Sequence, residues 1–317
     1  MMLVVPTGTR DLGKKMTSMD QETSAPVSRE RLASSCVCCG SDDLAASPAI
    51  LMPFVAHRVF GWAPVEIDES WGLKTIQSGM AYSICKSLRC RQCSHLFCDI
   101  RFSDTEMNVL YAGYREDAYV ALRDHYEPGY RARNAGLVEI VTYKPQIEAF
   151  LDPYLRDPQS QGQLTILDWG GDTGSNTPYE QHRTTLDIFD ISGKDVVPGA
   201  RVVSLEQATS AKYRLVICGQ LLEHTPYPSD VLAEVRKAMD AESVLYIEVP
   251  FEPIMQQDAP DRETVKRHWH EHINFYSQSS LEALLRTHGF EIVDQGVLEI
   301  NIGGNDAKIL QVACRRV

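Results

Sequence analysis

The chain has 317 residues, of which 44% are hydrophobic and 23% charged, a composition typical of a globular protein with about two domains. Lysine and arginine number 31 and aspartate and glutamate 43, so the net charge is −12, which disfavours nucleic acid as a partner because its phosphates would be repelled. The sequence has no apolar run near the ~18–20 residues of a membrane span and no secretory layout at its start, so we expect a cytoplasmic protein.

Four regions follow one another along the chain. Residues 1–33 are polar and aperiodic, which predicts a disordered tail. Residues 34–103 are rich in cysteine and turn-forming residues, and residues 104–150 read as helical, with many tyrosines and arginines. From 151 to 317, apolar runs such as "LTILDW", "RTTLDIF", "YRLVICG" and "SVLYIEVP" alternate with helical stretches. This alternation predicts a doubly wound α/β sheet, and the last two apolar runs predict a C-terminal β-hairpin.

The cysteines form two short motifs, "CVCCG" and "CRQC". In a reducing compartment cysteines favour metal ligands or buried thiols over disulfides. Cys36 and Cys39, with Cys90 and Cys93, could hold one tetrahedral structural zinc ion, and the long gap between the pairs adds little entropy cost. Simple burial of the thiols is the alternative, while a redox role for "CRQC" lacks a surrounding thioredoxin-like unit. Three other cysteines could replace a ligand: Cys38, Cys85 and Cys98.

A glycine-rich turn, "LDWGGDTG", stands where the first predicted strand of the α/β region meets its first helix. Gly170, Gly171 and Gly174 would let the backbone approach a ligand closely, and Asp168 stands at the strand end. The spacing does not fit a dinucleotide fingerprint, and no Lys-Ser/Thr pair follows as in an NTPase loop. Asp190, at the end of the second strand, could accept hydrogen bonds from vicinal ribose hydroxyls.

These motifs resemble the class I S-adenosylmethionine-dependent methyltransferases, whose sheet is Rossmann-like. The resemblance implies that the segment from Asp168 to Gly174 borders the methionine part of the cofactor and that Asp190 binds the ribose. The stretch "CGQLLEHTPYP" matches the family's hydrophobic stretch followed by Glu-His and Pro, so Gln220 and Leu221 would lie along the cofactor. Glu206 would lie near the adenine. An α/β domain with a vestigial cleft is the alternative.

The cysteine-rich region followed by this core resembles the sugar C-methyltransferases of deoxysugar and surface-glycan pathways. The matching stretches are "WHEHINFYS" (269–277), "SSLEALLRTHGFEIVD" and "IGGNDAKI" (302–309). Trp269 replaces a tyrosine of the family motif, and Asp172 stands where class I enzymes commonly have a small residue. The chain also ends at Val317, where the sugar enzymes continue into another α/β domain.

The stretch "HWHEH" has three histidines at alternate positions, which would share one face of a strand, whereas a helix would align only His268 and His272. Either arrangement could bind a metal, but acid–base catalysis and a purely structural role are also open. The resemblance implies that His272 is the base, Glu271 its partner and His270 a wall of the pocket, with His268 a bystander.

This histidine stretch is expected as a loop at the carboxyl edge of the sheet, next to the cofactor crevice. It follows a strand that ends at Pro250 and precedes a helix. We expect that helix to start at a capping box formed by Ser279 and Glu282 and to stop at Gly289.

The tyrosine-rich region is expected to close over the substrate, since the resembled enzymes have such a segment there. Its candidate substrate contacts are Tyr111, Tyr114, Arg115 and Tyr119. The alternative is that these tyrosines only pack on the core and bind no substrate.

The sequence therefore predicts a methyltransferase with S-adenosylmethionine as cofactor and a structural zinc ion. Its acceptor would be a sugar, nucleotide-linked or part of a glycan precursor. The alternatives are a methyltransferase for another small molecule, for RNA or for protein, and a cofactor-dead zinc scaffold. The charge of −12 argues against RNA, and the carboxylates of the two motifs argue against the scaffold.

Overall fold

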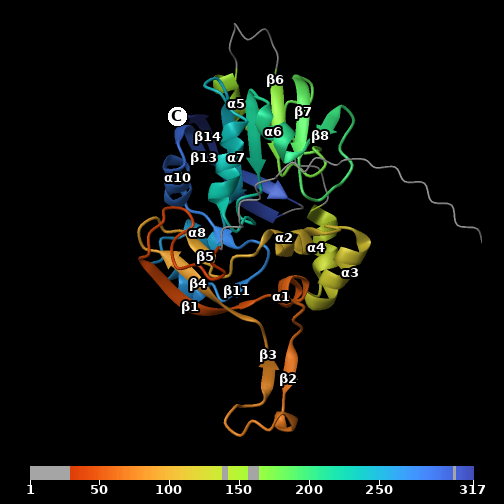
Figure 1. The fold of residues 1–317 in the computed structure, drawn as a ribbon, viewed down its shortest axis with the longest axis vertical. Helices are drawn as coiled ribbons and strands as arrows, with labels where there is room; N and C mark the ends of the chain where they lie inside the picture. Colours follow the sequence, from red (N-terminus) through yellow and green to blue (C-terminus); the bar gives the residue numbers. More distant parts are fainter. Residues whose placement is uncertain (1–28, 138–141, 156–163, 303–304) are drawn as a thin grey trace, which may run out of the picture.

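The computed structural model describes residues 29–137, 142–155, 164–302 and 305–317, which fold around two main sheets (Figure 1). Most of the predicted tail, residues 1–28, lies outside the described residues. Its end, residues 29–33, is held against the small sheet and the first helix of the helical region. The Ala33 amide donates to the Asp99 carbonyl over 2.8 Å, and the Arg31 guanidinium pairs with Glu106 at 2.6 Å.

The large sheet is doubly wound and ends in a long hairpin, as predicted. Its strand order is β13-β14-β10-β9-β6-β7-β8, and β6 to β10 run parallel. The hairpin joins through β14, which is antiparallel to β10. The strands are β6 (Leu164–Trp169), β7 (Arg183–Phe189), β8 (Ala200–Val202), β9 (Leu215–Gly219), β10 (Val244–Pro250), β13 (Phe290–Ile302) and β14 (Asn305–Arg316).

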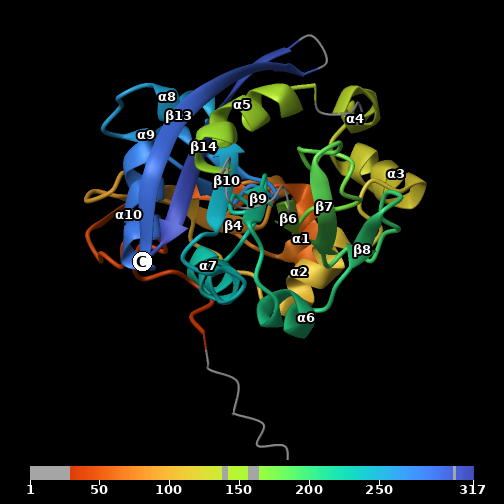
Figure 2. The same cartoon turned by 90° about the horizontal axis from the view of Figure 1, so that it is seen from above.

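Helices cover both faces of this sheet because its central strands are apolar on both sides. On β9, Leu215 and Ile217 pack toward α5 (Lys144–Leu155), whereas Val216 and Cys218 pack toward α7 (Pro228–Lys237) and α10 (Gln278–Thr287). Figure 2 shows α5 on one side of the strands and α6 (Leu205–Ser210) with α7 on the other. Burial of alternate side chains on opposite faces thus fixes the three-layer core.

The small sheet combines strands from both ends of the sequence. Its order is β11-β1-β4-β5-β12, with β1 (Leu44–Leu51), β4 (Ile84–Cys90) and β5 (Leu96–Cys98) from the cysteine-rich region. The outer strands β11 (His268–Trp269) and β12 (Asn274–Phe275) come from the histidine stretch. The cysteine-rich region and the α/β region therefore share one sheet.

The expected helical region contains α2 (Asp104–Tyr111), α3 (Asp117–Tyr126) and α4 (Tyr130–Leu137), followed by α5. Together with α1 (Pro53–Phe60), α2 and α3 pack on one face of the small sheet. None of the helices in the described ranges has the length and the apolar run needed to traverse a bilayer.

The start of α10 corrects the predicted capping box. The N-cap is Ser277, whose hydroxyl oxygen accepts from the Ser280 amide over 3.1 Å. Ser279 instead donates its hydroxyl to the Cys93 carbonyl at 3.0 Å, and Glu282 pairs with Arg286 on the helix surface. The predicted stop is confirmed, since Gly289 follows the helix with φ +76°.

Candidate active site

The glycine turn lies directly after β6 and is sterically tight. Gly170 and Gly174 have φ of +80° and +76°, which favours glycine. A Cβ on Gly171 would come within 2.6 Å of Cγ of Asp168, and one on Gly170 within 2.9 Å of a methyl group of Leu221. The backbone of this turn therefore lies flat against the Asp168 and Leu221 side chains.

Two carboxylates frame the turn. Asp168 is buried and accepts a hydrogen bond from the Thr177 hydroxyl over 2.6 Å, and burial raises its pKa to about 7. The Asp190 carboxylate accepts from the amides of Asp172 at 2.9 Å and Ser192 at 2.7 Å. Asp190 is thus fixed at the end of β7, where it borders the turn.

Asp172 stands where a small residue was expected, and its backbone has a conformation that an aspartate can adopt. It has φ +50°, a conformation that aspartate tolerates better than most residues. Its side chain lies 2.9 Å from the Lys194 ammonium.

The loop after β9 forms the opposite side of the crevice. Gln220 has φ +51°, and its amide donates to the Glu248 carbonyl over 2.9 Å. The buried Glu248 carboxylate accepts from the hydroxyls of Tyr143 at 3.1 Å and Tyr246 at 2.9 Å. It also accepts from the side-chain amide of Gln220 at 3.3 Å. Sequence reasoning missed Glu248 and Tyr143, because no local motif links residues 105 positions apart.

The strand order places the switch point of the sheet between β6 and β9. The chain moves outward from β6 to β8 in one direction and from β9 to β10 in the other, and this switch point is where open α/β sheets bind ligands. The structure brings all the residues predicted to bind the cofactor to that edge: Asp168, Gly170, Gly171, Gly174, Asp190, Gln220 and Leu221.

The histidine stretch lies beside the β9 loop. The Glu223 carbonyl accepts from the amides of Ile273 at 2.8 Å and Asn274 at 3.0 Å. The His272 ring is 4.6 Å from the His224 ring and 4.9 Å from the His270 ring, centroid to centroid. His268, by contrast, is exposed on β11. The three histidines therefore do not share one strand face, as a continuous strand would require.

His272 has a carboxylate partner, but not the expected one. Its Nδ1 lies 3.2 Å from Oε1 of Glu252, which follows β10. The Glu271 carboxylate instead accepts two hydrogen bonds from Arg123 on α3, at 2.5 and 2.8 Å. The expected Glu271–His272 pairing is thus replaced by two pairs, because the side chains of residues 271 and 272 point to different elements.

The surroundings of His272 and His224 shift the pKa values of the two rings in opposite directions. Burial alone lowers the pKa of His272, but the contact with Glu252 and the charges of Glu223 and Glu271 outweigh it, so the pKa is raised. Burial lowers the pKa of His224 to about 3. His272 is therefore the histidine of the cluster that gains and loses a proton most readily near neutral pH.

Glu223 is a further buried acid that the sequence reasoning did not assign. Both its carboxylate oxygens lack a hydrogen-bond partner among the described residues, and burial raises its pKa to about 7. Glu223, His224 and His272 could together offer ligand atoms to a metal, whereas the three histidines of "HWHEH", for which metal binding was one alternative, form no such group in the described chain. The signal for Glu223 was the Glu-His pair of "LLEHTP".

The tyrosine-rich helices cover the histidine cluster. The Tyr111 hydroxyl lies 2.7 Å from Nδ1 of His224. The Tyr114 ring lies between the Arg115 guanidinium, 5.0 Å away, and the Lys194 ammonium, 5.4 Å away. The buried hydroxyl of Tyr119 has no hydrogen-bond partner in the described ranges. Two expected substrate residues, Tyr111 and Tyr114, thus lie next to the histidines and the glycine turn, while all three tyrosines also pack on the core.

The four predicted metal ligands converge. The sulfur atoms of Cys36 and Cys93 are 3.5 Å apart, those of Cys39 and Cys90 are 3.6 Å apart, and all four lie within 4.8 Å of one another. Four thiolates around zinc at about 2.3 Å would be separated by about 3.8 Å, so the spacing fits this ion. Cys85 and Cys98 form a separate group with Asp99, and Cys38 is buried outside the four.

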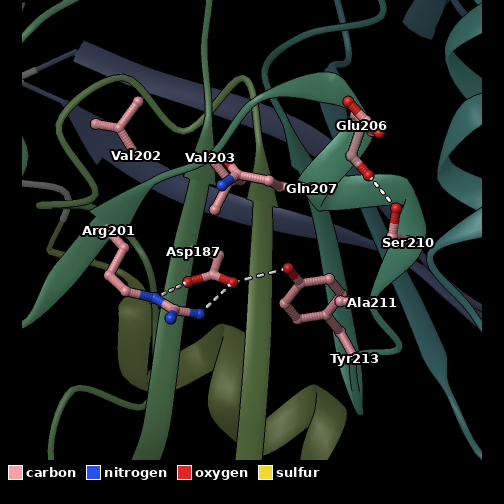
Figure 3. A pocket seen from close by; sticks show the side chains of 9 residues that line it. All are labelled: Asp187, Arg201, Val202, Val203, Glu206, Gln207, Ser210, Ala211 and Tyr213. Atoms are coloured by element: carbon pink, nitrogen blue, oxygen red, sulfur yellow. Dashed lines mark hydrogen bonds and ion pairs between the residues drawn. The ribbon is translucent and has the colours of Figure 1, made fainter.

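Two hollows are lined by residues of the large sheet and its neighbouring segments. One, of about 650 Å³, lies between β7, β8 and α6 and includes Glu206, the residue expected near adenine (Figure 3). In it the Asp187 carboxylate is held by Arg201 at 2.7 Å and by the Tyr213 hydroxyl at 2.7 Å. The other hollow, of about 780 Å³, lies between the end of β10 and the β13–β14 hairpin, and it includes Glu252. The second hollow thus contains the carboxylate that faces His272.

The fold is an open α/β sheet in which the glycine turn and the β9 loop meet at the switch point. Residues 139–295, just under half of the chain, match the family model described as a methyltransferase domain. The protein is an S-adenosylmethionine-dependent methyltransferase. No curated protein matches the sequence.

The solved structures that match this chain have low sequence identity to it. The 1,6-didemethyltoxoflavin N1-methyltransferase of Burkholderia thailandensis is 18% identical, over 63% of this chain and 88% of its own, with a TM-score of 0.42. The magnesium protoporphyrin IX methyltransferase of Synechocystis PCC 6803 is 17% identical, over 66% of this chain and 96% of its own, with a TM-score of 0.38.

Proposed function

We propose that the protein transfers a methyl group from S-adenosylmethionine to a sugar, either nucleotide-linked or part of a glycan precursor, with His272 as the base. The observation that supports this most is the attachment of the histidine loop to the β9 loop. The carbonyl of Glu223, which lies three residues after Gln220, accepts hydrogen bonds from the backbone amides of Ile273 and Asn274. This attachment would hold His272 beside the bound cofactor.

His272 is suited to accept a proton from an attacking oxygen or carbon. Its Nδ1 faces the Glu252 carboxylate, which favours the tautomer with hydrogen on Nδ1. Nε2 is then the free lone pair, and it takes the acceptor's proton as the new bond to the methyl carbon forms. The cofactor supplies an electrophilic methyl group on a sulfonium, so the chain must position the acceptor in line and remove its proton.

The cofactor would lie on the glycine turn. Asp168 and the glycines 170, 171 and 174 would border its methionine part, Asp190 would accept the ribose hydroxyls, and Gln220 with Leu221 would line its other side. Support comes from the close approach that the turn permits and from the free lone pairs that each Asp190 oxygen keeps.

The acceptor would be bound by Tyr111, Tyr114, Arg115 and Tyr119, with His270 as a wall of the pocket. Aromatic faces and a guanidinium suit a sugar and its phosphates. Arg123 would act indirectly, by holding Glu271 and with it the loop.

The structural zinc ion would be held by Cys36, Cys39, Cys90 and Cys93. A reducing compartment such as the cytoplasm would keep these thiols available. Zinc here would supply folding energy and no chemistry, because four protein ligands leave no open position.

The test is a turnover assay with nucleotide sugars as acceptors, in which S-adenosylhomocysteine and the methylated product are measured. We expect His272→Ala to lower kcat by about 10²–10⁴, the range of general acid–base catalysis, with cofactor affinity unchanged. His268→Ala is the matched control, since His268 is exposed on β11, and it should keep full activity. Turnover of another acceptor class alone would overturn the sugar assignment. Full activity of His272→Ala would overturn the base.

A further inference from the structure

A projecting hairpin carries an unusual share of the exposed apolar side chains. We call residues 60–84 the arm; it runs from the end of α1 to the start of β4 and includes β2 (Val65–Ile67), η1 (Glu69–Trp71) and β3 (Gly79–Ala81). Sixteen large hydrophobic side chains are exposed among the described residues, and eight of them lie in the arm. These eight are Phe60, Trp62, Trp71, Leu73, Ile76, Met80, Tyr82 and Ile84. The other eight are spread from residue 32 to residue 317.

The arm has no core of its own. β2 and β3 pair over three residues each, and no residue of β2, η1 or β3 is buried. Figure 1 shows that the arm extends away from the rest of the molecule. A lone two-stranded hairpin is only marginally stable in water, so an apolar arm of this kind gains stability from a partner that covers it.

We propose that the arm is the contact surface of a homodimer, in which the arm of one copy packs on the arm of the other. The eight side chains are 39% to 81% exposed. Together they leave on the order of 800 Å² accessible, about what each partner contributes to a stable interface and more than the usual patch on a monomer. The arm alone therefore offers enough area for a dimer.

The distribution of charge allows a second copy and disfavours an anionic membrane. The arm has one lysine and three acids, Glu66, Asp68 and Glu69, while the whole chain has a net charge of −12. Contact through projecting arms keeps two acidic bodies apart, which limits their repulsion. An anionic membrane, by contrast, would repel the three acids.

The backbone of the arm also suits a twofold contact. A two-stranded sheet has an unpaired edge on each strand, and an edge can pair with its own copy about a twofold axis. The inference goes beyond the proposed function and does not rest on it.

The test is the mass of the full chain in solution by light scattering over a series of protein concentrations. We expect twice the monomer mass of 35.6 kDa at micromolar concentration. The double variant Trp71→Ser, Ile76→Ser should shift to 35.6 kDa, because both side chains are about half exposed in the arm. The control Val265→Ser, Val297→Ser removes two exposed side chains outside the arm and outside the proposed cofactor site, and it should remain a dimer.

Zinc content and cofactor affinity should be unchanged in both variants, which shows that they are folded. A wild-type chain that stays at 35.6 kDa at all concentrations would overturn the proposal. The same holds if the monomeric chain binds phosphatidylcholine vesicles. An arm variant that keeps the dimer mass would overturn it as well.

Discussion

Loss of the zinc ion is expected to disable the active site, because the histidine loop is built into the small sheet. The strands on either side of the loop pair with the cysteine-rich region: β11 with β1 and β12 with β5. Three backbone hydrogen bonds flank the loop at 3.0, 2.7 and 3.0 Å, from the amides of Ile50, Met52 and Cys98. The carbonyl of Cys93, one of the four clustered cysteines, also accepts from the hydroxyls of Ser277 at 3.3 Å and Ser279 at 3.0 Å.

The size of the effect follows from these bonds. Each contributes about 0.5–1.5 kcal/mol, so losing the three backbone bonds costs the ordered loop about 1.5–4.5 kcal/mol. At 1.4 kcal/mol per factor of ten, the population of the competent loop falls about 10- to 1,000-fold, and the methyl-transfer rate should fall with it. The perturbation is Cys93→Ser, which removes one ligand.

Three measurements check this prediction: zinc content by mass spectrometry, hydrogen exchange of residues 267–277, and turnover. Cys93→Ser should lose zinc, lose protection in the loop and lose rate. Cys38→Ser is the matched control, since Cys38 is equally buried in the same region but outside the four ligands, and it should keep zinc. A zinc-free Cys93→Ser protein with a protected loop and the wild-type rate would refute the coupling.

Further predictions concern the cofactor and the charged pairs. Asp190→Ala should weaken S-adenosylmethionine binding by about 1.5–3 kcal/mol, the scale of hydrogen bonds to a charged group, and unchanged calorimetric affinity would contradict its role. Turnover should rise with pH as His272 loses its proton, with a midpoint above the ordinary 6.5 because the pKa is raised. Glu252→Gln removes the charge that raises this pKa, so the midpoint should move to lower pH; an unmoved profile would show that another group titrates. Glu271→Gln should lower the free energy of unfolding by about 1.5–3 kcal/mol in a urea titration, the scale of a hydrogen bond to a charged group, since it removes one of the two carboxylates that pair with the buried Arg123, and a loss below about 0.5 kcal/mol would contradict a tight pair.

Local pattern was enough for the features that depend on neighbours in sequence. Apolar runs separated by helical stretches predict the parallel sheet, because both faces of its strands must be buried. The glycines after β6 predict the tight turn, since a Cβ at Gly171 would collide with Asp168. The two cysteine motifs predict the four-cysteine cluster, because each Cys-x2-Cys turn already brings two sulfur atoms together.

Only the tertiary structure decided the partners of the histidine loop. Strand alternation would align its histidines, but residues 268–269 and 274–275 join opposite edges of the small sheet, so the chain between them turns. That turn sends His272 to Glu252, 20 residues earlier, and Glu271 to Arg123, 148 residues earlier. A charge pair within a buried site is selected by distance in space, and spacing along the sequence does not encode that distance. The cap of α10 was likewise decided by the fold: the helix begins at Gln278, so Ser277 is the N-cap and Ser279 lies within the first turn.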